Sequence, residues 1–176
     1  MNGECFLKRI LCLITIFVLL FCGCTEGLYT GNNSEITDNS PAGYTPDKND
    51  ISEKALALAE SSVKEDGIYT TPATVAAYLH IFGRLPDNFI TKKEAVKLGW
   101  DNKEGNLSEI APGKSIGGDR FGNYEKKLPA GSYRECDVNY QEGARGAERL
   151  VYSDKGAVYY TSDHYKSFVQ LYKSRG

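Results

Sequence analysis

The spacing of apolar residues changes along this chain, and that change limits the folds open to it more than any other feature. Val75, Tyr78 and Phe82 recur at the three- and four-residue spacing of an amphipathic helix. From Tyr133 onward, apolar residues alternate with polar ones, which is typical of strands with one buried face. Helices that precede strands predict an α+β domain, with N-terminal helices packed on a C-terminal antiparallel β-sheet.

Capping signals set the expected helix boundaries. Thr71-Pro72 places a capping residue before a proline at the first helical position, and this helix is expected to end at Gly83. The run Thr91–Glu94 is a complete capping box for a short second helix, which places Lys92 on its first turn. Two further helices are expected over residues 50–65 and 106–111.

Three strands are expected in the C-terminal half of the chain. In the run Tyr133–Asn139, Cys136 and Glu135 alternate, so they are expected on opposite faces of the sheet. Two more β-rich runs follow, Arg149–Ser153 and Ala157–Thr161, and a short polar turn joins them as in a hairpin.

The formal net charge of −2 averages two regions of opposite sign. Residues 25–70 carry 3 Lys and Arg against 9 Asp and Glu, whereas residues 71–176 carry 16 against 13. The C-terminal region is therefore mildly basic, although affinity for a polyanion depends on where the basic side chains cluster. The length and the apolar content of 41% fit one globular domain, which we expect to be a monomer.

Residues 1–24 have the pattern of an export signal. Two basic residues precede the apolar run Ile10–Phe21, which is shorter than the roughly 20 residues of a membrane-spanning helix. The ending Leu20–Cys24 resembles a lipoprotein box, in which Cys24 becomes the lipidated first residue of the mature protein. An uncleaved anchor and ordinary signal cleavage are the alternatives. The expected location is extracellular or at the cell surface.

Two segments separate this signal from the basic region. Residues 25–49 are rich in Gly, Asn, Ser, Thr and Pro, which predicts a flexible linker. Residues 50–70 form a helical extension that is a spacer, a pro-segment or a packed part of the domain 71–176. Only one of the five cysteines, Cys136, lies in the folded region, where we expect it to be a buried apolar residue.

Polar side chains gather on strands that are expected to be adjacent. Glu135 and Asp137 share one strand face, and Arg145 and Arg149 lie at the start of the next strand. A carboxylate beside two guanidinium groups suits an anion that must be deprotonated nearby, although an ordinary solvated sheet face has the same composition. His164 follows the last expected strand, in a loop position suited to presenting its imidazole to a ligand.

Five segments of the chain form an ordered set: Arg84–Lys92, Leu98–Trp100, Gly105–Leu107, Ala111–Asp119 and Asp163–Tyr165. They resemble the corresponding segments of barnase-type bacterial guanyl-specific ribonucleases. The resemblance runs from about Thr71 to Leu171, in the same order and with nearly the same spacing. It implies a barnase-like α+β fold, an endoribonuclease activity and no metal or other cofactor.

The resemblance also implies a role for each candidate site residue. Glu135 is the implied general base and His164 the implied general acid. The other implied site residues are Lys92, Arg145 and Arg149 as phosphate ligands, Tyr165 beside them, and Asp119 and Asp137 as supporting partners, Asp137 for Arg145.

The implied guanine-binding loop departs from the barnase pattern. It falls on Phe121, Asn123, Tyr124 and Glu125, with Glu125 accepting hydrogen bonds from the base. Tyr124 stands where barnase has an arginine, which removes a positive charge and leaves a ring that can stack on guanine. Three residues are also missing before Tyr133, which replaces a tryptophan, and the helix predicted over residues 50–65 has no counterpart.

The expected reaction is cleavage of single-stranded RNA after guanosine, by transphosphorylation to a 2′,3′-cyclic phosphate that is then hydrolysed. The ribose 2′-hydroxyl is the nucleophile, so DNA is excluded as a substrate. A catalytically silent, surface-anchored module that binds RNA or protein on the same fold is the main alternative, and a structural lipoprotein without a ligand is another. The resemblance further implies an acidic, barstar-like intracellular inhibitor that covers the basic cleft.

Overall fold

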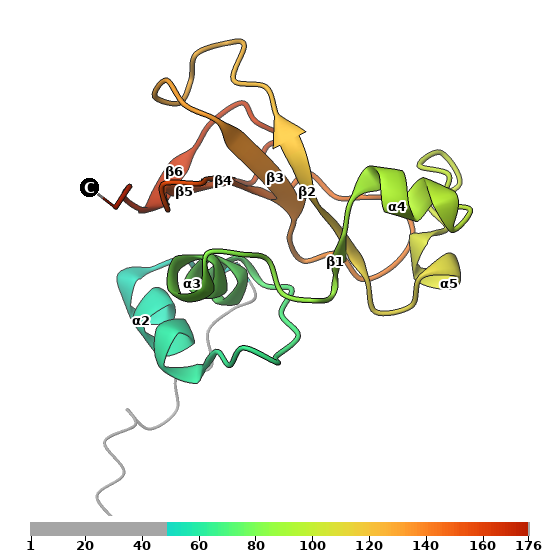
Figure 1. The fold of residues 1–176 in the computed structure, drawn as a ribbon, viewed down its shortest axis with the longest axis horizontal. Helices are drawn as coiled ribbons and strands as arrows, with labels where there is room; N and C mark the ends of the chain where they lie inside the picture. The colour runs from blue at the N-terminus through green and yellow to red at the C-terminus, as the bar shows by residue number, and fades with distance from the viewer. Residues whose placement is uncertain (1–48, 176) are drawn as a thin grey trace, which may run out of the picture. The chain divides into compact units, whose positions relative to one another are not determined.

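The computed structural model describes residues 49–175 of the chain (Figure 1). The predicted signal segment 1–24, the predicted lipidation site Cys24 and the predicted linker as far as residue 48 lie outside this range. In the part that is described, no helix is long and apolar enough to cross a membrane.

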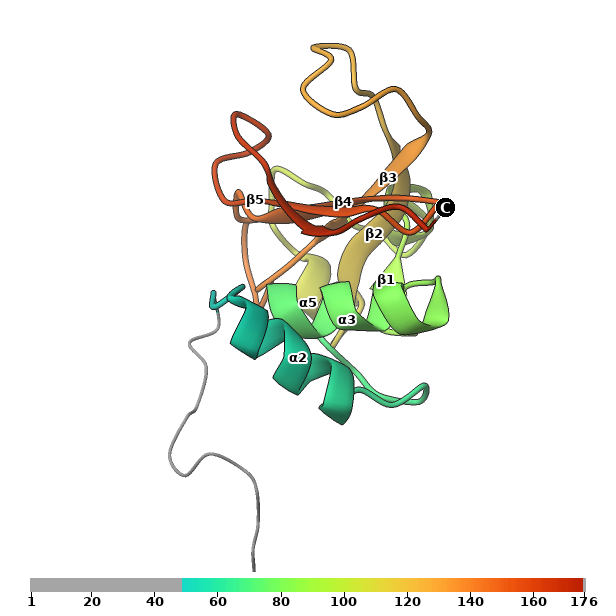
Figure 2. The same ribbon diagram turned by 90° about the vertical axis from the view of Figure 1, so that its left-hand side faces the viewer.

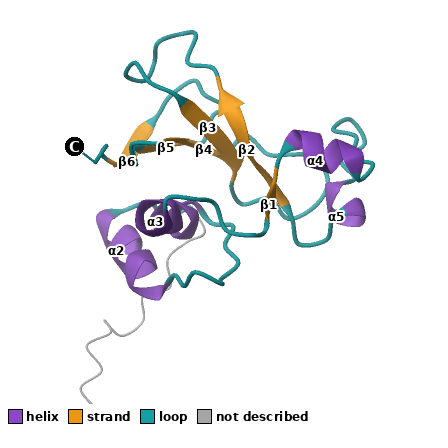
Figure 3. Cartoon of the chain, viewed as in Figure 1, coloured by secondary structure: helices purple, strands orange, loops and turns teal. Residues whose placement is uncertain are grey.

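A six-stranded β-sheet forms the centre of the described domain, and its strands lie side by side in chain order (Figure 3). β1 runs parallel to β2, whereas the other neighbouring pairs are antiparallel. This sheet and the helices before it confirm the predicted α+β class. The strands are β1 (Phe89–Ile90), β2 (Ser115–Phe121), β3 (Tyr133–Asp137), β4 (Arg149–Ser153), β5 (Val158–Thr161) and β6 (Val169–Tyr172).

The helices begin and end close to the predicted capping signals. Thr71 is the N-cap of α3, Pro72 is its first residue, and Gly83 ends it with a φ of 69°. Thr91 and Glu94 form both hydrogen bonds of the predicted capping box at the start of α4. The described helices are α2 (Glu53–Ser62), α3 (Pro72–Phe82), α4 (Lys92–Lys97) and α5 (Leu107–Ile110).

α3 covers one face of the sheet, and α2 packs beside α3 (Figure 2). Val75 and Leu79 of α3 share a hydrophobic core with Cys136, Leu150 and Val158 of the sheet. α4 and α5 lie at the β1 end of the sheet, over a smaller core around Trp100 (Figure 1). The helical face predicted from the apolar spacing is therefore the face that packs on the sheet.

Alternation along β3 sends neighbouring side chains to opposite faces, as the sequence predicts. Cys136 is 1% exposed in the core under α3, and burial raises the pKa of its thiol well above the ordinary value. This confirms that Cys136 is a buried apolar residue. Glu135 lies on the other face, where Tyr133, Val151 and Tyr159 form a separate apolar cluster.

Three strands, β1, β2 and β6, were not predicted from the sequence. β2 contains Gly117-Gly118, for which the sequence indicates only a turn or a bulge, and the register with β3 does shift between Gly117 and Asp119. A Cβ atom on Gly117 would lie 2.6 Å from the Cβ of Cys136, so glycine lets the bulged strand approach β3 closely. β6 is an edge strand with no clear alternation of buried residues.

α2 is shorter than the helix predicted over residues 50–65. It begins after Ser52, whose side chain accepts a hydrogen bond from Ala55 N, and it ends where Val63 becomes extended. Leu56 and Ala59 are buried in the same core as α3. Outside the core, the Tyr172 hydroxyl of β6 donates a hydrogen bond to Glu60 at 2.7 Å.

We expect Leu56→Ala to lower the free energy of unfolding by about 2–4 kcal/mol, because it removes a buried side chain between α2 and α3. Leu58→Ala is the matched control, since Leu58 is 39% exposed on the same helix, and its effect should stay within about 0.5 kcal/mol. Urea denaturation measures both values. Equal effects of the two substitutions would show that α2 does not pack as described.

Candidate active site

Glu135 lies in the middle of β3 and is held by side chains from two other segments. Lys92 Nζ, from the first turn of α4, donates a hydrogen bond to Glu135 Oε1 at 2.6 Å. The Tyr165 hydroxyl, from the loop after β5, donates to Glu135 Oε2 at 2.6 Å. Because Glu135 is only 8% exposed, these contacts fix its carboxylate where the three segments meet.

Opposing effects set the pKa of Glu135. Burial raises this pKa because it disfavours the charged form, whereas hydrogen bonds from Lys92 and Tyr165 lower it. The outcome is a pKa below the ordinary value for glutamate. For Tyr165, burial and the contact with Glu135 both raise the pKa. Glu135 is therefore an ionised acceptor at neutral pH, and Tyr165 is a neutral donor.

Asp137 lies two residues further along β3 and pairs with both predicted arginines. Arg145 Nε and Nη2 donate to its two carboxylate oxygens at 2.6 and 2.7 Å, which is the pairing implied by the resemblance. Arg149 Nε lies 2.8 Å from Asp137 Oδ1 but is not aligned for a hydrogen bond, so this contact is an ion pair. Asp137 thus holds two positive charges beside Glu135.

The three predicted phosphate ligands differ in how far solvent reaches them. The exposed fraction of the side chain is 41% for Lys92, 14% for Arg145 and 3% for Arg149. Arg149 also donates to the backbone carbonyls of Gly146 and Glu148. An anion that arrives from solvent therefore meets Lys92 and Arg145 directly, with Arg149 buried beside Asp137.

Asp119 connects the sheet to α4. It pairs with Glu135 in the register between β2 and β3, and its Oδ2 accepts a hydrogen bond from the backbone N of Lys92 at 2.9 Å. Since Lys92 is the first residue of α4, this bond holds the start of the helix at the polar face of the sheet. Asp119 thereby positions Lys92 near Glu135.

His164 lies in the turn after β5, and its backbone is in the left-handed region, with a φ of 56°. Its imidazole is exposed and contacts the ring of Tyr165, with 4.7 Å between ring centroids. Tyr165 therefore contacts both members of the predicted acid–base pair, Glu135 through its hydroxyl and His164 through its ring.

The predicted guanine-binding loop lies next to this turn. The ring centroids of Phe121 and Tyr165 lie 5.2 Å apart. The Asn123 side chain forms hydrogen bonds with the backbone N and O of Leu128. Phe121, Asn123 and Tyr124 contribute to the lining of a pocket of about 400 Å³, and Tyr124 is 92% exposed. Glu125 is paired with Lys127 Nζ at 2.6 Å.

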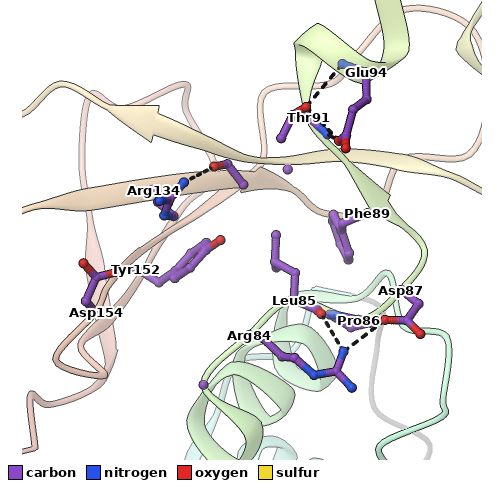
Figure 4. A pocket seen from close by; sticks show the side chains of 13 residues that line it. Arg84, Leu85, Pro86, Asp87, Phe89, Thr91, Glu94, Arg134, Tyr152 and Asp154 are labelled. Atoms are coloured by element: carbon purple, nitrogen blue, oxygen red, sulfur yellow. Dashed lines mark hydrogen bonds and ion pairs between the residues drawn. The ribbon is translucent and has the colours of Figure 1, made fainter. Parts of the chain in front are cut away.

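A larger pocket, drawn in Figure 4, has a volume of about 590 Å³. It lies on the opposite face of the sheet from Glu135. Arg134 and Tyr152 line it from the sheet, and Leu85 and Phe89 line it from the segment between α3 and α4. Because Arg134 precedes Glu135 on β3, its side chain points to the other face. This pocket is thus separate from the predicted site.

In the range 49–175, no three His, Cys, Asp or Glu side chains lie close enough together to hold a metal ion. The charges that the described site offers to an anion are those of Lys92, Arg145 and Arg149. A carboxylate base with these cations beside it can accept a proton from a hydroxyl and stabilise an attacked phosphate.

Comparison with known proteins assigns residues 73–172 to the family described as ribonuclease. The chain belongs to the ribonuclease family. A ribonuclease from Bacillus intermedius is 48% identical over 122 residues, which cover 68% of this chain and 75% of that relative. A ribonuclease from Heyndrickxia coagulans is 54% identical over 100 residues, with 55% and 92% covered, and one from Bacillus pumilus is 50% identical over 114 residues, with 63% and 70% covered. The resemblance to barnase-type ribonucleases is confirmed.

Lys127 of this ribonuclease was not among the residues predicted for the site. Lys127 Nζ pairs with Glu125 and also donates to the backbone oxygen of Tyr165 at 3.0 Å. It therefore connects the predicted base-binding loop to the turn that carries His164. A lysine beside another lysine in a polar loop carries no sequence signal of such a link.

We expect Tyr165→Phe to move the acidic limb of the pH profile of kcat/KM to higher pH. The substitution removes a hydrogen bond that lowers the pKa of Glu135, so this pKa rises and Glu135, the predicted base, is protonated at a higher pH. Tyr172→Phe is the control, since the Tyr172 hydroxyl bonds to Glu60 instead. An unchanged limb in Tyr165→Phe would exclude the hydroxyl as a cause of the lowered pKa.

Proposed function

We propose that this ribonuclease cleaves single-stranded RNA, preferentially after guanosine, in a metal-independent reaction that forms a 2′,3′-cyclic phosphate and then hydrolyses it. Membership of the ribonuclease family supports endoribonuclease activity on RNA. The observation that carries the proposal is the Glu135 carboxylate, kept ionised by Lys92 and Tyr165. This carboxylate is suited to remove a proton from a ribose hydroxyl.

In the first step, Glu135 takes the proton of the 2′-hydroxyl as the 2′-oxygen forms a bond to phosphorus. The bond between phosphorus and the 5′-oxygen breaks, and the protonated imidazole of His164 gives its proton to this leaving oxygen. In the second step, water attacks the cyclic phosphate with the two roles reversed. DNA has no 2′-hydroxyl and is not cleaved in this way.

Positive charge is needed because the attacked phosphate gains negative charge in the transition state. Lys92 and Arg145 have exposed atoms that suit contact with the phosphate oxygens. Arg149 is buried, so we assign it a supporting role through its charge and its pairing with Asp137. These three cations supply the stabilisation for which other nucleases use a metal ion, which is our reason for proposing metal independence.

The proposed preference for guanosine rests on Glu125 and Tyr124. Guanine presents adjacent N1–H and N2–H donors that one carboxylate can accept together, whereas adenine has no such pair. Tyr124 is exposed and suited to stack on the base, while Phe121 and Asn123 hold the loop beside the turn of Tyr165. In the structure Glu125 is paired with Lys127.

We also propose that the protein is exported by its residues 1–24 and tethered through a lipid on Cys24. The sequence pattern of this segment supports the proposal. The remaining proposals are that the domain works as a monomer and that an acidic, barstar-like protein inhibits it inside the producing cell.

Glu135→Gln and His164→Ala should each lower kcat on RNA by about 10²-fold or more, because each removes a group that transfers a proton. The measurement is the rate of cleavage of a GpU dinucleotide, with circular dichroism to check folding. Glu142→Gln is the matched control, since Glu142 is exposed outside the site. A silent binding module would show the same rate in all three variants and the parent.

Glu125→Ala should reduce the preference for guanosine, because it removes the acceptor for N1–H and N2–H. Tyr124→Ala should weaken binding to all bases by about 1–3 kcal/mol through lost stacking, without changing their order. Rates on the dinucleotides GpU, ApU, UpU and CpU measure both effects. A parent enzyme with equal rates on all four would refute the guanine site and leave the catalytic pair standing.

A further inference from the structure

The turn that carries His164 has an energetically unfavourable backbone conformation. His164 and Tyr165 follow one another in the left-handed region, with φ values of 56° and 70°, and neither is a glycine. Consecutive side-chain-bearing residues rarely adopt this conformation without support, because each Cβ approaches the backbone too closely. Contacts outside these two residues must therefore maintain the turn.

Asp163 supplies most of these contacts. Its Oδ1 accepts hydrogen bonds from Thr161 Oγ1 at 2.9 Å and from the backbone N of Lys166 and Ser167 at 3.0 Å each. Its Oδ2 accepts a bond from Ser167 Oγ at 2.6 Å. The carboxylate thus ties together residues on both sides of His164 and Tyr165.

Thr161 connects this cluster to the sheet. It is 1% exposed at the end of β5, where it pairs with Arg149 of β4. Its Oγ1 also accepts a hydrogen bond from the backbone N of Tyr165 at 3.0 Å. The turn is therefore fixed relative to the strands that carry Arg149 and Glu135.

The imidazole of His164 has no such fixation of its own. Among the described residues it has no hydrogen-bonding partner, and its contact is with the Tyr165 ring. Its place relative to Glu135 consequently depends on the backbone of the turn. Hydrogen bonds from Ser167, Thr161 and Lys166 also hold the pKa of Asp163 below its ordinary value, so Asp163 remains a charged acceptor at neutral pH.

We propose that Asp163 is a positioning residue for the general acid, and that it holds His164 where its proton reaches the leaving 5′-oxygen. The inference rests on the proposed role of His164. The proposed role predicts different effects on substrates with different leaving groups. Expulsion of a nucleoside 5′-oxygen, a poor leaving group, needs a well-placed acid, whereas expulsion of 4-nitrophenolate does not.

The test compares two substrates in the full chain, GpU and guanosine 3′-(4-nitrophenyl phosphate). We expect Asp163→Ala to lower kcat on GpU by roughly 10–100-fold, with little change in KM, and to alter kcat on the nitrophenyl ester by less than about 3-fold. Asp163→Asn keeps one acceptor oxygen and should recover part of the loss. Asp154→Asn, in the exposed turn between β4 and β5, is the matched control and should change neither rate.

The outcomes separate this inference from the assignment of His164. If His164→Ala loses activity on GpU much more than on the ester while Asp163→Asn and Asp163→Ala lose activity equally on both substrates or on neither, the positioning role is wrong. If His164→Ala lowers kcat equally on both substrates, the assignment of His164 as the general acid is wrong, and the positioning role that rests on it is wrong too. Should Asp163→Ala not fold, Ser167→Ala removes one bond to the same carboxylate and should show a smaller loss confined to GpU.

Discussion

The buried carboxylate of Glu135 and its hydrogen bonds from Lys92 and Tyr165 are the interactions on which the rest of the site depends. A glutamate that is 8% exposed needs compensation to remain charged, and here it comes from two segments that are distant in sequence. The N-terminus of α4 and the turn after β5 must therefore both reach the middle of β3. Asp119 fixes α4 there, and the Asp163 carboxylate fixes the turn.

The two faces of the sheet differ in what they carry, since one face carries the main core and the other carries the charged site. Cys136 and Leu150 face α3 and form the main core, while Glu135 and Asp137, at alternate positions of β3, face the charged site. Side chains along a strand alternate between its two faces with a period of two residues. Once the core face of β3 is fixed, the side chains that lie on its polar face are fixed as well. This arrangement holds Glu135 and Asp137 on the face opposite the main core.

The sequence predicted the parts of this structure that depend on local chemistry. The caps at Thr71 and Thr91 and the alternation at Cys136 were correct, because local hydrogen bonds and one buried face determine them. The strands β1, β2 and β6 were missed, since their positions depend on neighbours, glycine packing or a sheet edge. For the site, the resemblance implied that Asp137 pairs with Arg145, as the structure has it, but the burial of Arg149 and the link through Lys127 arise only from tertiary packing.

In the proposed reaction, the 2′-hydroxyl attacks the phosphate without help from a metal ion. The most direct test is to follow the cleavage of GpU by the full chain in excess chelator with phosphorus NMR spectroscopy. We predict that guanosine 2′,3′-cyclic phosphate appears first and is then converted to guanosine 3′-phosphate, and that a substrate with 2′-deoxyguanosine stays intact. Formation of guanosine 3′-phosphate with no cyclic intermediate, cleavage of the deoxy substrate, or loss of activity in chelator that added metal restores would contradict the account.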